Sequence, residues 1–170
     1  MGKFDNLKVK EEIERLEKQI QDLYLDDDMP WIVGYSGGKD STAVLQLTWS
    51  AISKLKEEQR KKKIYVISTD TLVENPVVSM WVTASLRKMK EEAEKQNLPI
   101  EPHRLTPEID KTFWVNLIGR GYPAPRRGFR WCTERLKINP AKNFILNVIG
   151  TTNEAIMVLG VRKAESGTRK

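Results

Sequence analysis

The sequence reads Tyr35-Ser36-Gly37-Gly38-Lys39-Asp40-Ser41 at the point that decides the fold. An apolar run, residues 31–33, precedes this stretch, and a helical pattern follows it from Thr42. This order predicts a strand, a turn and a helix. The paired glycines carry no Cβ, so the backbone can turn sharply there and approach a ligand closely. A helix that begins right after such a turn presents unpaired N–H groups and the positive end of its dipole, and phosphate binds at that point.

The polar side chains of the stretch fit the same interpretation. Lys39 adds a full positive charge, and the Ser41 hydroxyl either donates to a phosphate oxygen or caps the helix. Asp40 makes most sense with a cation, such as Mg²⁺, between its carboxylate and the phosphate. We predict these phosphate ligands: Ser36, Gly37, Gly38, Lys39 and Ser41. Lys39 and Asp40 are also the candidate catalytic residues, and Asp40 the candidate magnesium ligand. The alternative is a plain glycine turn in which Lys39 and Asp40 are solvated.

Two better-known phosphate loops do not match. A Walker loop needs Lys followed directly by Ser or Thr, whereas Asp40 intervenes here and Val33 stands where that loop needs glycine. The dinucleotide fingerprint needs three glycines at G-x-G-x-x-G spacing, which this stretch lacks. Residues 36–41 instead resemble the pyrophosphate loop (PP-loop) of the ATP pyrophosphatase and PAPS reductase superfamily. The resemblance implies an adenine nucleotide alpha hydrolase-like fold, ATP binding and, as in many members, cleavage of ATP between the α and β phosphates.

Composition indicates one globular domain of ordinary size. Of the 170 residues, 39% are hydrophobic and 31% charged, and no apolar run approaches the length of a membrane span. The N-terminal stretch is charged rather than apolar, so it does not predict a signal peptide. A single cysteine excludes an internal disulfide and favours a reducing, cytoplasmic location without a membrane partner. The net charge of +6 suits an anionic ligand.

Apolar strands alternate with amphipathic helices along the chain. We expect helices over residues 8–25, from residue 42, from the Asn75-Pro76 cap, over 108–118 and over 143–149, and strands over 31–35, 64–68, 99–105 and 154–159. Right-handed crossovers between such strands predict an α/β fold, with a parallel sheet flanked by helices on both faces. We interpret residues 1–170 as one nucleotide-binding domain. The third helix should bury an apolar stripe made of Val78, Trp81, Val82, Leu86, Met89 and Ala93.

Three further polar positions have weaker signals. Asp70 follows the second strand, where ligands of parallel sheets bind, so it either meets a ribose or a metal, or caps the next loop. The acidic run 26–28 is typical of a solvated turn at a helix end rather than of a metal site. The chain's one histidine, His103, lies in the third strand with no Ser or Cys nearby in the sequence, and we assign it no role.

A loop rich in Gly, Pro and Arg, residues 119–128, leads to the only cysteine, Cys132. Nearby cations favour the reactive thiolate, and aromatic residues together with arginines suit stacking and phosphate contact. The cations are Arg126, Arg127, Arg130, Arg135 and Lys137, and the interleaved aromatics are Tyr122, Phe129 and Trp131. We therefore favour a catalytic role for Cys132. The alternative is a small buried residue.

A second motif follows the last strand, and it reads Gly160-Val161-Arg162-Lys163-Ala164-Glu165-Ser166. It resembles the other signature of the PAPS reductase group, which lines the pocket opposite the PP-loop. The resemblance implies that Arg162 and Ser166 bind phosphate. Arg162 could hold a phosphate or sulfate through two hydrogen bonds, and Arg169 could join it.

Several stretches together resemble the DndC family of DNA phosphorothioation proteins, over nearly the whole chain. They are residues 31–49, 67–76, 118–125 and 130–133. The resemblance implies an ATP pyrophosphatase that activates a DNA backbone phosphate so that sulfur can replace a non-bridging oxygen. It also implies an iron–sulfur cluster with Cys132 as a ligand, and DNA, a cysteine desulfurase and the other Dnd proteins as partners.

The cysteine count departs from that family, whose members are longer and hold the cluster with several cysteines. Such clusters normally need about four thiolates, so one copy of this chain should not assemble one. We expect the chain to be the N-terminal part of a longer protein. Two alternatives stay open: a reductase of adenylyl sulfates, and a nucleotide-binding module without turnover.

Overall fold

The computed structural model describes residues 6–150 and 154–161 and contains one parallel sheet of four strands in the order β3-β2-β1-β4. The strands are β1 (Trp31–Gly34), β2 (Ile64–Thr69), β3 (Ile100–Leu105) and β4 (Ile156–Val158). The longer helices are α1 (Asn6–Leu25), α2 (Lys39–Ser53), α3 (Pro76–Lys95) and α5 (Asn139–Ile149). The predicted α/β fold with a parallel sheet is confirmed.

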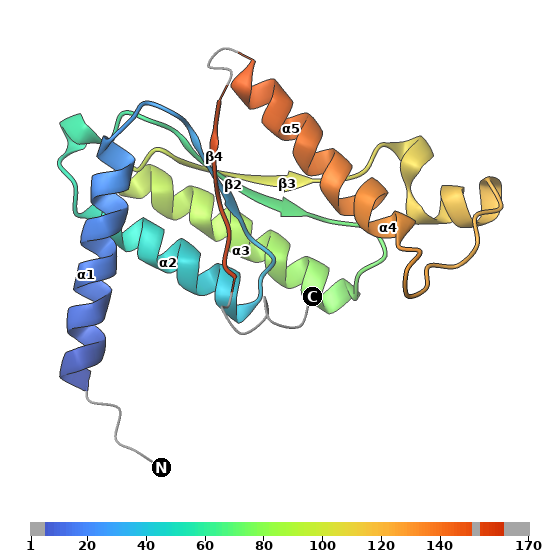
Figure 1. Ribbon diagram of the computed structural model, residues 1–170, viewed down its shortest axis with the longest axis horizontal. Helices are drawn as coiled ribbons and strands as arrows, with labels where there is room; N and C mark the ends of the chain where they lie inside the picture. The colour runs from blue at the N-terminus through green and yellow to red at the C-terminus, as the bar shows by residue number, and fades with distance from the viewer. Residues whose placement is uncertain (1–5, 151–153, 162–170) are drawn as a thin grey trace.

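Helices cover both faces of the sheet, as predicted. Figure 1 shows α2 and α3 on one side and α5 on the other. Along β2, the side chains of Ile64 and Val66 join the main core beneath α2 and α3, whereas Tyr65 meets Phe144 of α5, with 5.7 Å between ring centroids. This alternation is the two-residue period of a strand. The strand order also reverses between β1 and β4, which creates a topological switch point beside the end of β1.

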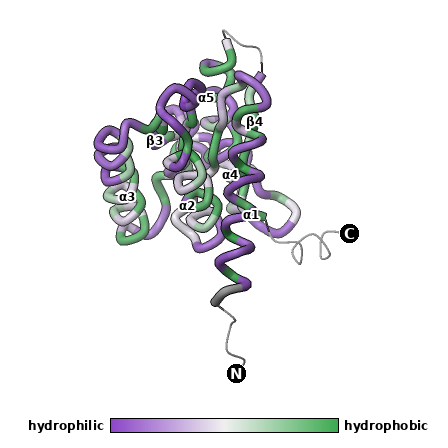
Figure 2. Tube along the Cα trace, turned by 90° about the vertical axis from the view of Figure 1, so that its left-hand side faces the viewer, coloured by the Kyte–Doolittle hydropathy of each residue, from purple (hydrophilic) through white to green (hydrophobic). Residues whose placement is uncertain are grey.

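The N-terminal helix packs against α2. Figure 2 shows α1 as a mostly hydrophilic tube interrupted by apolar positions. Tyr24 is buried in the core, and Ile20 packs against the core. Glu17, also buried, accepts hydrogen bonds from Ser50 (2.5 Å) and Lys54. A few apolar contacts and the hydrogen-bonded carboxylate of Glu17 therefore fix α1 against α2.

The cap of α3 forms as predicted, but part of its apolar stripe is not buried. The Asn75 side chain accepts a hydrogen bond from the backbone N–H of Val77 at 2.9 Å, and Pro76 occupies the first turn. Val82 is buried, whereas Val78 is 45% exposed and Trp81 50% exposed. The prediction was wrong for Val78 and Trp81 because the first turns of α3 lie beside the loop after β1 and not under the sheet. Helical spacing alone does not reveal how far a helix overhangs its sheet.

The segment predicted as a helix over residues 108–118 is instead two separate turns. A 3₁₀ turn, Ile109–Lys111, is followed by one π-helical turn, Val115–Gly119. The buried Asn116 side chain donates to the carbonyl oxygens of Lys111 and Thr112 at 2.9 and 2.8 Å. Asn side chains that bond to the backbone compete with regular helix formation, which explains the interruption.

Further along, α4 (Trp131–Thr133) continues through a π turn (Glu134–Ile138) into α5. Within the described helices, none combines the length and apolar character that crossing a membrane requires.

Candidate functional site

The loop after β1 closes on itself through two serines. The Ser41 hydroxyl donates to the Gly38 carbonyl at 3.0 Å and accepts from the Ser36 N–H at 3.2 Å. Ser41 is buried, so its hydroxyl fixes the curvature of the loop from the inside. Gly38 is the N-cap of α2 and provides no side chain to bond the first amides of that helix. The predicted glycine turn and helix start are present, and phosphate binding at this helix N-terminus stays a prediction.

Gly37 is required by its conformation and by its neighbours. Its φ is +74°, which favours glycine, and a Cβ there would stand 2.7 Å from the Trp81 ring and 2.9 Å from Val82. The ring of Trp81 also stacks on Tyr35, with 6.5 Å between centroids. The partly exposed Trp81 therefore supports the loop from the side of α3.

A pocket of about 410 Å³ lies at this loop, at the switch point of the sheet. It is lined by Ser36 and Ser41 of the loop, by the last residues of β2, and by Gly160 after β4. Glu74 and Lys137 complete its wall from two other elements, and their side chains are 3.5 Å apart. The pocket thus gathers hydroxyls and one ammonium–carboxylate pair beyond the carboxyl ends of the strands, where ligands of open α/β sheets bind.

Gly160 brings β4 directly against the start of α2. A Cβ at Gly160 would stand 2.8 Å from the Asp40 carbonyl oxygen and 3.1 Å from the Ser41 nitrogen. Only a residue without a side chain allows the two segments to approach this closely. Gly160, which with Val161 is the part of the second sequence motif that lies within the described residues, is therefore a neighbour in space of the loop after β1. Arg162, Ser166 and Arg169 lie outside them.

Lys39 and Asp40, the predicted catalytic pair, occupy the first turn of α2. Lys39 is exposed, and within the described residues its ammonium group has no hydrogen-bond or ion-pair partner. Asp40 is half-buried and engaged in an interaction of its own. An unpartnered ammonium at a helix N-terminus is well placed to bind phosphate oxygens.

Asp70 has protein partners in this structure. Its carboxylate accepts from the Leu72 N–H at 2.9 Å and pairs with Arg104, which also donates to Ser79 at 2.6 Å. Burial raises the pKa of Asp70, but the bonds from Leu72 and Arg104 outweigh it and hold the pKa below its usual value. Asp70 is not among the residues that line the pocket at the loop. The loop-capping alternative thus describes its present contacts, and ligand binding by Asp70 stays a prediction.

Cys132 lines a second, smaller pocket of about 240 Å³ next to the first. Glu74 and Lys137 line both pockets, so their ion pair forms a shared wall. Cys132 itself is half-buried, and its neighbour Leu136 is fully buried. The only thiol of the chain therefore lies beside the predicted nucleotide site, separated from it by one exposed ion pair.

The five cations predicted around the thiol have different positions. Arg135 donates to Asn116 Oδ1 at 2.9 Å and to the Tyr122 hydroxyl at 2.6 Å, so it supports the lobe formed by residues 109–130. Lys137 faces the shared wall. Arg126, Arg127 and Arg130 are exposed on the loop before Cys132.

Within the described residues no group of three or more His, Cys, Asp or Glu side chains is placed to hold a metal ion. Cys132 as the lone thiol does not fit a cluster that needs about four thiolates. Mg²⁺ is a different case, because it commonly uses one carboxylate together with substrate phosphates and water. Asp40, at the start of α2, suits that role.

Sequence reasoning missed Glu74 as a site residue. The sequence predicts Lys137 only as one of the cations near the thiol. Glu74 and Lys137 are ordinary charged residues in the sequence, and their contact joins the start of α3 to the segment after Cys132. The position of Glu74, just before the Asn75 cap and beyond the end of β2, was the one available signal.

His103, to which the sequence assigned no role, belongs to an aromatic cluster. Its ring contacts Tyr65 and Phe144, at centroid distances of 5.7 and 4.7 Å, and burial holds its pKa below the usual value. It contributes to the α5 face of the sheet, on the far side from α2.

Fold and site together define an α/β protein with a pocket at the switch point of a parallel sheet. No protein-family model matches the chain. The uncharacterized protein MJ0066 of Methanocaldococcus jannaschii is 31% identical to it over 150 residues, which are 88% of this chain and 26% of that protein. The chain therefore spans about a quarter of the length of this relative. Among solved structures, the U34-tRNA thiolase NcsA from Methanococcus maripaludis with its 4Fe-4S cluster is similar at a TM-score of 0.47 and 14% identity, over 89% of this chain and 46% of that one.

Proposed function

We propose that this chain is the ATP-binding part of a pyrophosphatase-type enzyme of the PAPS reductase-like PP-loop superfamily, and that the enzyme activates a DNA backbone phosphate for sulfur incorporation. The observation that carries the proposal is the Ser36–Ser41 loop at the end of β1, which opens on a pocket of about 410 Å³ and leaves Lys39 unpartnered among the described residues. The DNA substrate rests on the resemblance of the sequence to the DndC family.

The chemistry would begin with ATP in this pocket. Amides of the loop and Lys39 would hold the β and γ phosphates and stabilise the charge that develops on the leaving pyrophosphate. Mg²⁺, held by Asp40, would supply additional neutralisation of phosphate charge. A non-bridging oxygen of the DNA phosphate would attack the α-phosphorus, with release of pyrophosphate. Hydrosulfide would then displace AMP from the DNA phosphorus, and the departing AMP would take that oxygen with it and leave sulfur in its place.

Cys132 is the residue of this chain that suits sulfur handling, because its pocket shares a wall with the nucleotide pocket. The described residues do not provide the ligands of an iron–sulfur cluster. A cysteine desulfurase and the other Dnd proteins are proposed partners for sulfur supply.

Release of pyrophosphate from ATP, measured with and without duplex DNA, tests the proposal. We expect release that DNA stimulates and that Lys39→Ala abolishes. ATP binding without any release would favour a nucleotide-binding module, and thiol-dependent reduction of an adenylyl sulfate would favour the reductase. Absence of ATP binding would overturn the proposal altogether.

The role of Cys132 has a test of its own, in cells that carry the gene with Cys132→Ser. A hydroxyl cannot carry persulfide sulfur and is a poor ligand for soft metals. We expect ATP binding to persist and phosphorothioate-linked dinucleotides to vanish from digested DNA, as read by mass spectrometry. Normal levels of those dinucleotides would exclude a chemical role for this thiol.

A further inference from the structure

We infer that the turn formed by residues 126–130 is a nucleic-acid contact, which binds phosphodiester groups through three arginines and a base through Phe129. This inference rests on the proposed function in one respect, because that function supplies the nucleic-acid substrate that the turn would hold next to the site. It concerns a surface that is distinct from the nucleotide pocket, because none of these residues lines that pocket.

The turn is well defined. Arg126 and Phe129 exchange two backbone hydrogen bonds, at 3.1 and 2.9 Å, and Gly128 between them has a φ of +87°. A glycine with positive φ at this position is what a type II turn requires. Arg127 is therefore held at the tip.

Aromatic packing fixes the base of the turn. Trp131 is buried, stacks on Phe113 with 5.4 Å between centroids, and donates its indole N–H to the Pro123 carbonyl at 3.0 Å. Tyr122 contacts Trp131 edge-on at 5.6 Å. An anchored base means that the exposed side chains above it lose little further backbone freedom on binding, which favours affinity.

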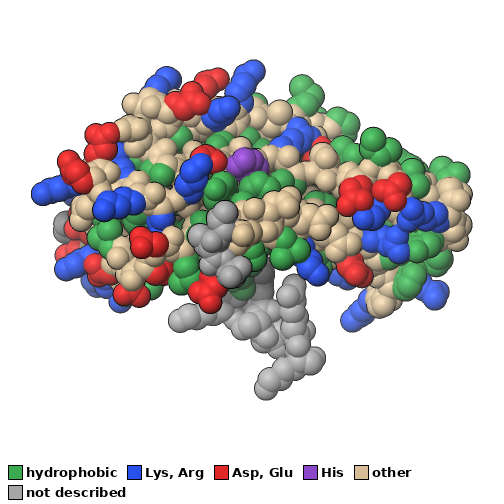
Figure 3. Space-filling view, turned by 90° about the horizontal axis from the view of Figure 1, so that it is seen from above, with side chains coloured by type: hydrophobic (Ala, Val, Ile, Leu, Met, Phe, Trp, Pro, Cys, Tyr) green, Lys and Arg blue, Asp and Glu red, His purple; other side chains and the backbone are tan. Residues whose placement is uncertain are grey.

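The arginines of this turn differ from the others in the described part of the chain. Arg126, Arg127 and Arg130 are exposed, and their guanidinium groups have no hydrogen-bond or ion-pair partner among the described residues. Every other described arginine has such a partner; these are Arg15, Arg60, Arg87, Arg104, Arg120 and Arg135. Figure 3 likewise shows acidic side chains close to basic ones over much of one face of the molecule. Unpartnered guanidinium groups therefore gather at one place.

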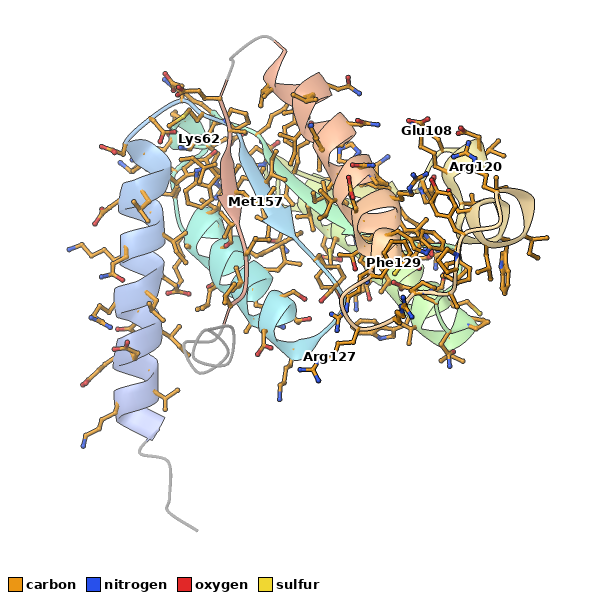
Figure 4. All side chains as sticks on the ribbon, turned by 45° about the vertical axis from the view of Figure 1, so that its right-hand side comes forward. Lys62, Glu108, Arg120, Arg127, Phe129 and Met157 are labelled. Carbon is orange, nitrogen blue, oxygen red and sulfur yellow. The ribbon has the colours of Figure 1, made fainter. Side chains whose placement is uncertain are left out.

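Phe129 stands among these cations and is 42% exposed. Phe129 and Arg127, both labelled in Figure 4, belong to the turn that precedes α4. Arginines beside an exposed aromatic ring are the combination that single-stranded nucleic acids use, because the charges follow the backbone while a base stacks on the ring. An apolar peptide would have no use for three such charges.

The position of the turn also fits a polymeric substrate. The chain passes from Arg130 directly into Trp131 and Cys132, and Cys132 lines the pocket that shares its wall with the nucleotide site. Figure 1 shows the arrowheads of β2 and β3 pointing toward this lobe. A strand of nucleic acid bound on the turn would therefore lie near the carboxyl ends of the strands, as both pockets do.

The test compares two triple variants that lose the same charge. In one, Arg126, Arg127 and Arg130 become Gln; in the other, the exposed residues Lys10, Lys61 and Arg87, from other parts of the surface, become Gln. Binding to fluorescein-labelled single-stranded DNA, duplex DNA and RNA of one sequence is measured by anisotropy over a range of salt concentrations. The first variant should lose affinity by roughly 100-fold at about 0.1 M salt, and its salt slope should fall by roughly one for each phosphate contact removed. The control should change little.

Phe129→Ala separates stacking from charge. It should weaken binding to single strands by about tenfold and leave the salt slope unchanged, because the stacking interaction involves no counterion release. Equal losses in both triple variants, or no binding by the unmodified chain, would overturn the inference. The inference is also wrong if all three nucleic acids bind equally to both variants. If an acidic protein then binds the unmodified chain and not the first variant, the surface is a protein contact instead.

ATP affinity, measured on the same samples by calorimetry, keeps the two proposals apart. The arginine variants should bind ATP normally. A chain that binds nucleic acid through the turn but does not bind ATP would refute the proposed function and leave this inference standing.

Discussion

Lysine side chains at the two ends of the sheet have opposite surroundings. At the amino end, the side chain of Lys62 is only 4% exposed, pairs with Asp27 at 2.6 Å, and lies over the rings of Tyr24 and Trp31 at 4.9 and 5.2 Å. The Tyr24 hydroxyl also donates to the Lys62 carbonyl at 2.6 Å. At the carboxyl end, Lys39 is exposed and unpartnered within the described chain.

The difference shows what each end contributes. A buried ammonium is tolerable only when it is paired, so the bonds at the amino end serve stability. A cation that is left without a partner contributes little to folding and is available to an anionic ligand. The contrast can be tested by mutations that remove one group from each end.

The largest effect should come from Asp27→Ala, at the amino end. This change leaves the Lys62 ammonium buried without its partner and also removes the acceptor of the Met29 N–H, 2.8 Å away. Breaking a buried pair from one side costs about 3 kcal/mol, whereas ATP affinity should not change. Urea denaturation gives the first quantity and calorimetry the second. Lys62→Met is the matched variant, because it removes the charge and keeps the packing, and it should cost far less. An equal cost would mean that the loss of the pair itself, and not the unpaired buried ammonium, destabilises the protein.

The same pair predicts part of the acid sensitivity. The hydrogen bond from Lys62 is the main reason that the pKa of Asp27 lies below its usual value, although burial opposes the shift. Its stabilisation is therefore present above the unfolded-state pKa, near about 3.9, and is lost as the pH falls through the lower folded-state pKa. The stability of Asp27→Ala should accordingly fall less steeply than that of the unmodified chain below about pH 4. Parallel curves for the two proteins would contradict this linkage.

At the carboxyl end, Lys39→Ala should have the reverse signature. A charge-assisted phosphate contact contributes about 1.5–3 kcal/mol, so ATP affinity should fall by roughly tenfold or more. Because Lys39 is exposed and unpartnered among the described residues, the free energy of unfolding should change by less than about 0.5 kcal/mol. Lys10→Ala, on the exposed surface of α1, is the control for charge alone. Unchanged ATP affinity would place the phosphates elsewhere.

The sequence predicted most of what is local at these two ends. The loop after β1, the Asn75 cap and all four strands follow from residue types at short spacing, with strand limits that differ by a few residues. The sequence did not predict that Arg104 would bind Asp70, because that contact depends on how β3 and β2 pair. The sequence predicts Trp81 in the core for a related reason. Helical spacing identifies which residues share one face of a helix, but not which part of the protein that face contacts.

The amino-end pair was likewise invisible in the sequence. Asp27 belongs to an acidic run that looked like a solvated turn, and Lys62 to a charged linker. Both become partly or fully buried only because the end of α1 and the start of β2 meet beside Trp31. Non-local contacts decide which members of a charge run are solvated.

A smaller effect should follow from Gly160→Ala, where β4 meets the start of α2. The new Cβ would lie 2.8 Å from the Asp40 carbonyl oxygen, and backbone atoms cannot move aside as a flexible side chain can. Overpacking of this kind costs about 1–2 kcal/mol, and the displaced loop should bind ATP several-fold more weakly. In Gly119→Ala, by contrast, the nearest atom to the new Cβ is 3.9 Å away. If both variants behave alike, the close approach of β4 does not shape the loop.

The smallest effect concerns Glu74, whose carboxylate lies on the wall between the two pockets. Its pair with Lys137 has side chains that are 31% and 59% exposed, so Glu74→Gln should change stability by less than about 0.5 kcal/mol. Binding should respond in the opposite direction from Lys39→Ala. A unit charge about 6 Å from a phosphate charge contributes roughly 0.7 kcal/mol in water, so removing this repulsion should tighten ATP binding about threefold at low salt. The gain should shrink at about 0.5 M salt, where screening is strong.

Calorimetry at both salt concentrations, with and without Mg²⁺, measures the ATP affinity of Glu74→Gln. Weaker ATP binding only when Mg²⁺ is present would show instead that Glu74 helps to hold the metal, and weaker binding in both cases would show that it holds Lys137 in place for the nucleotide.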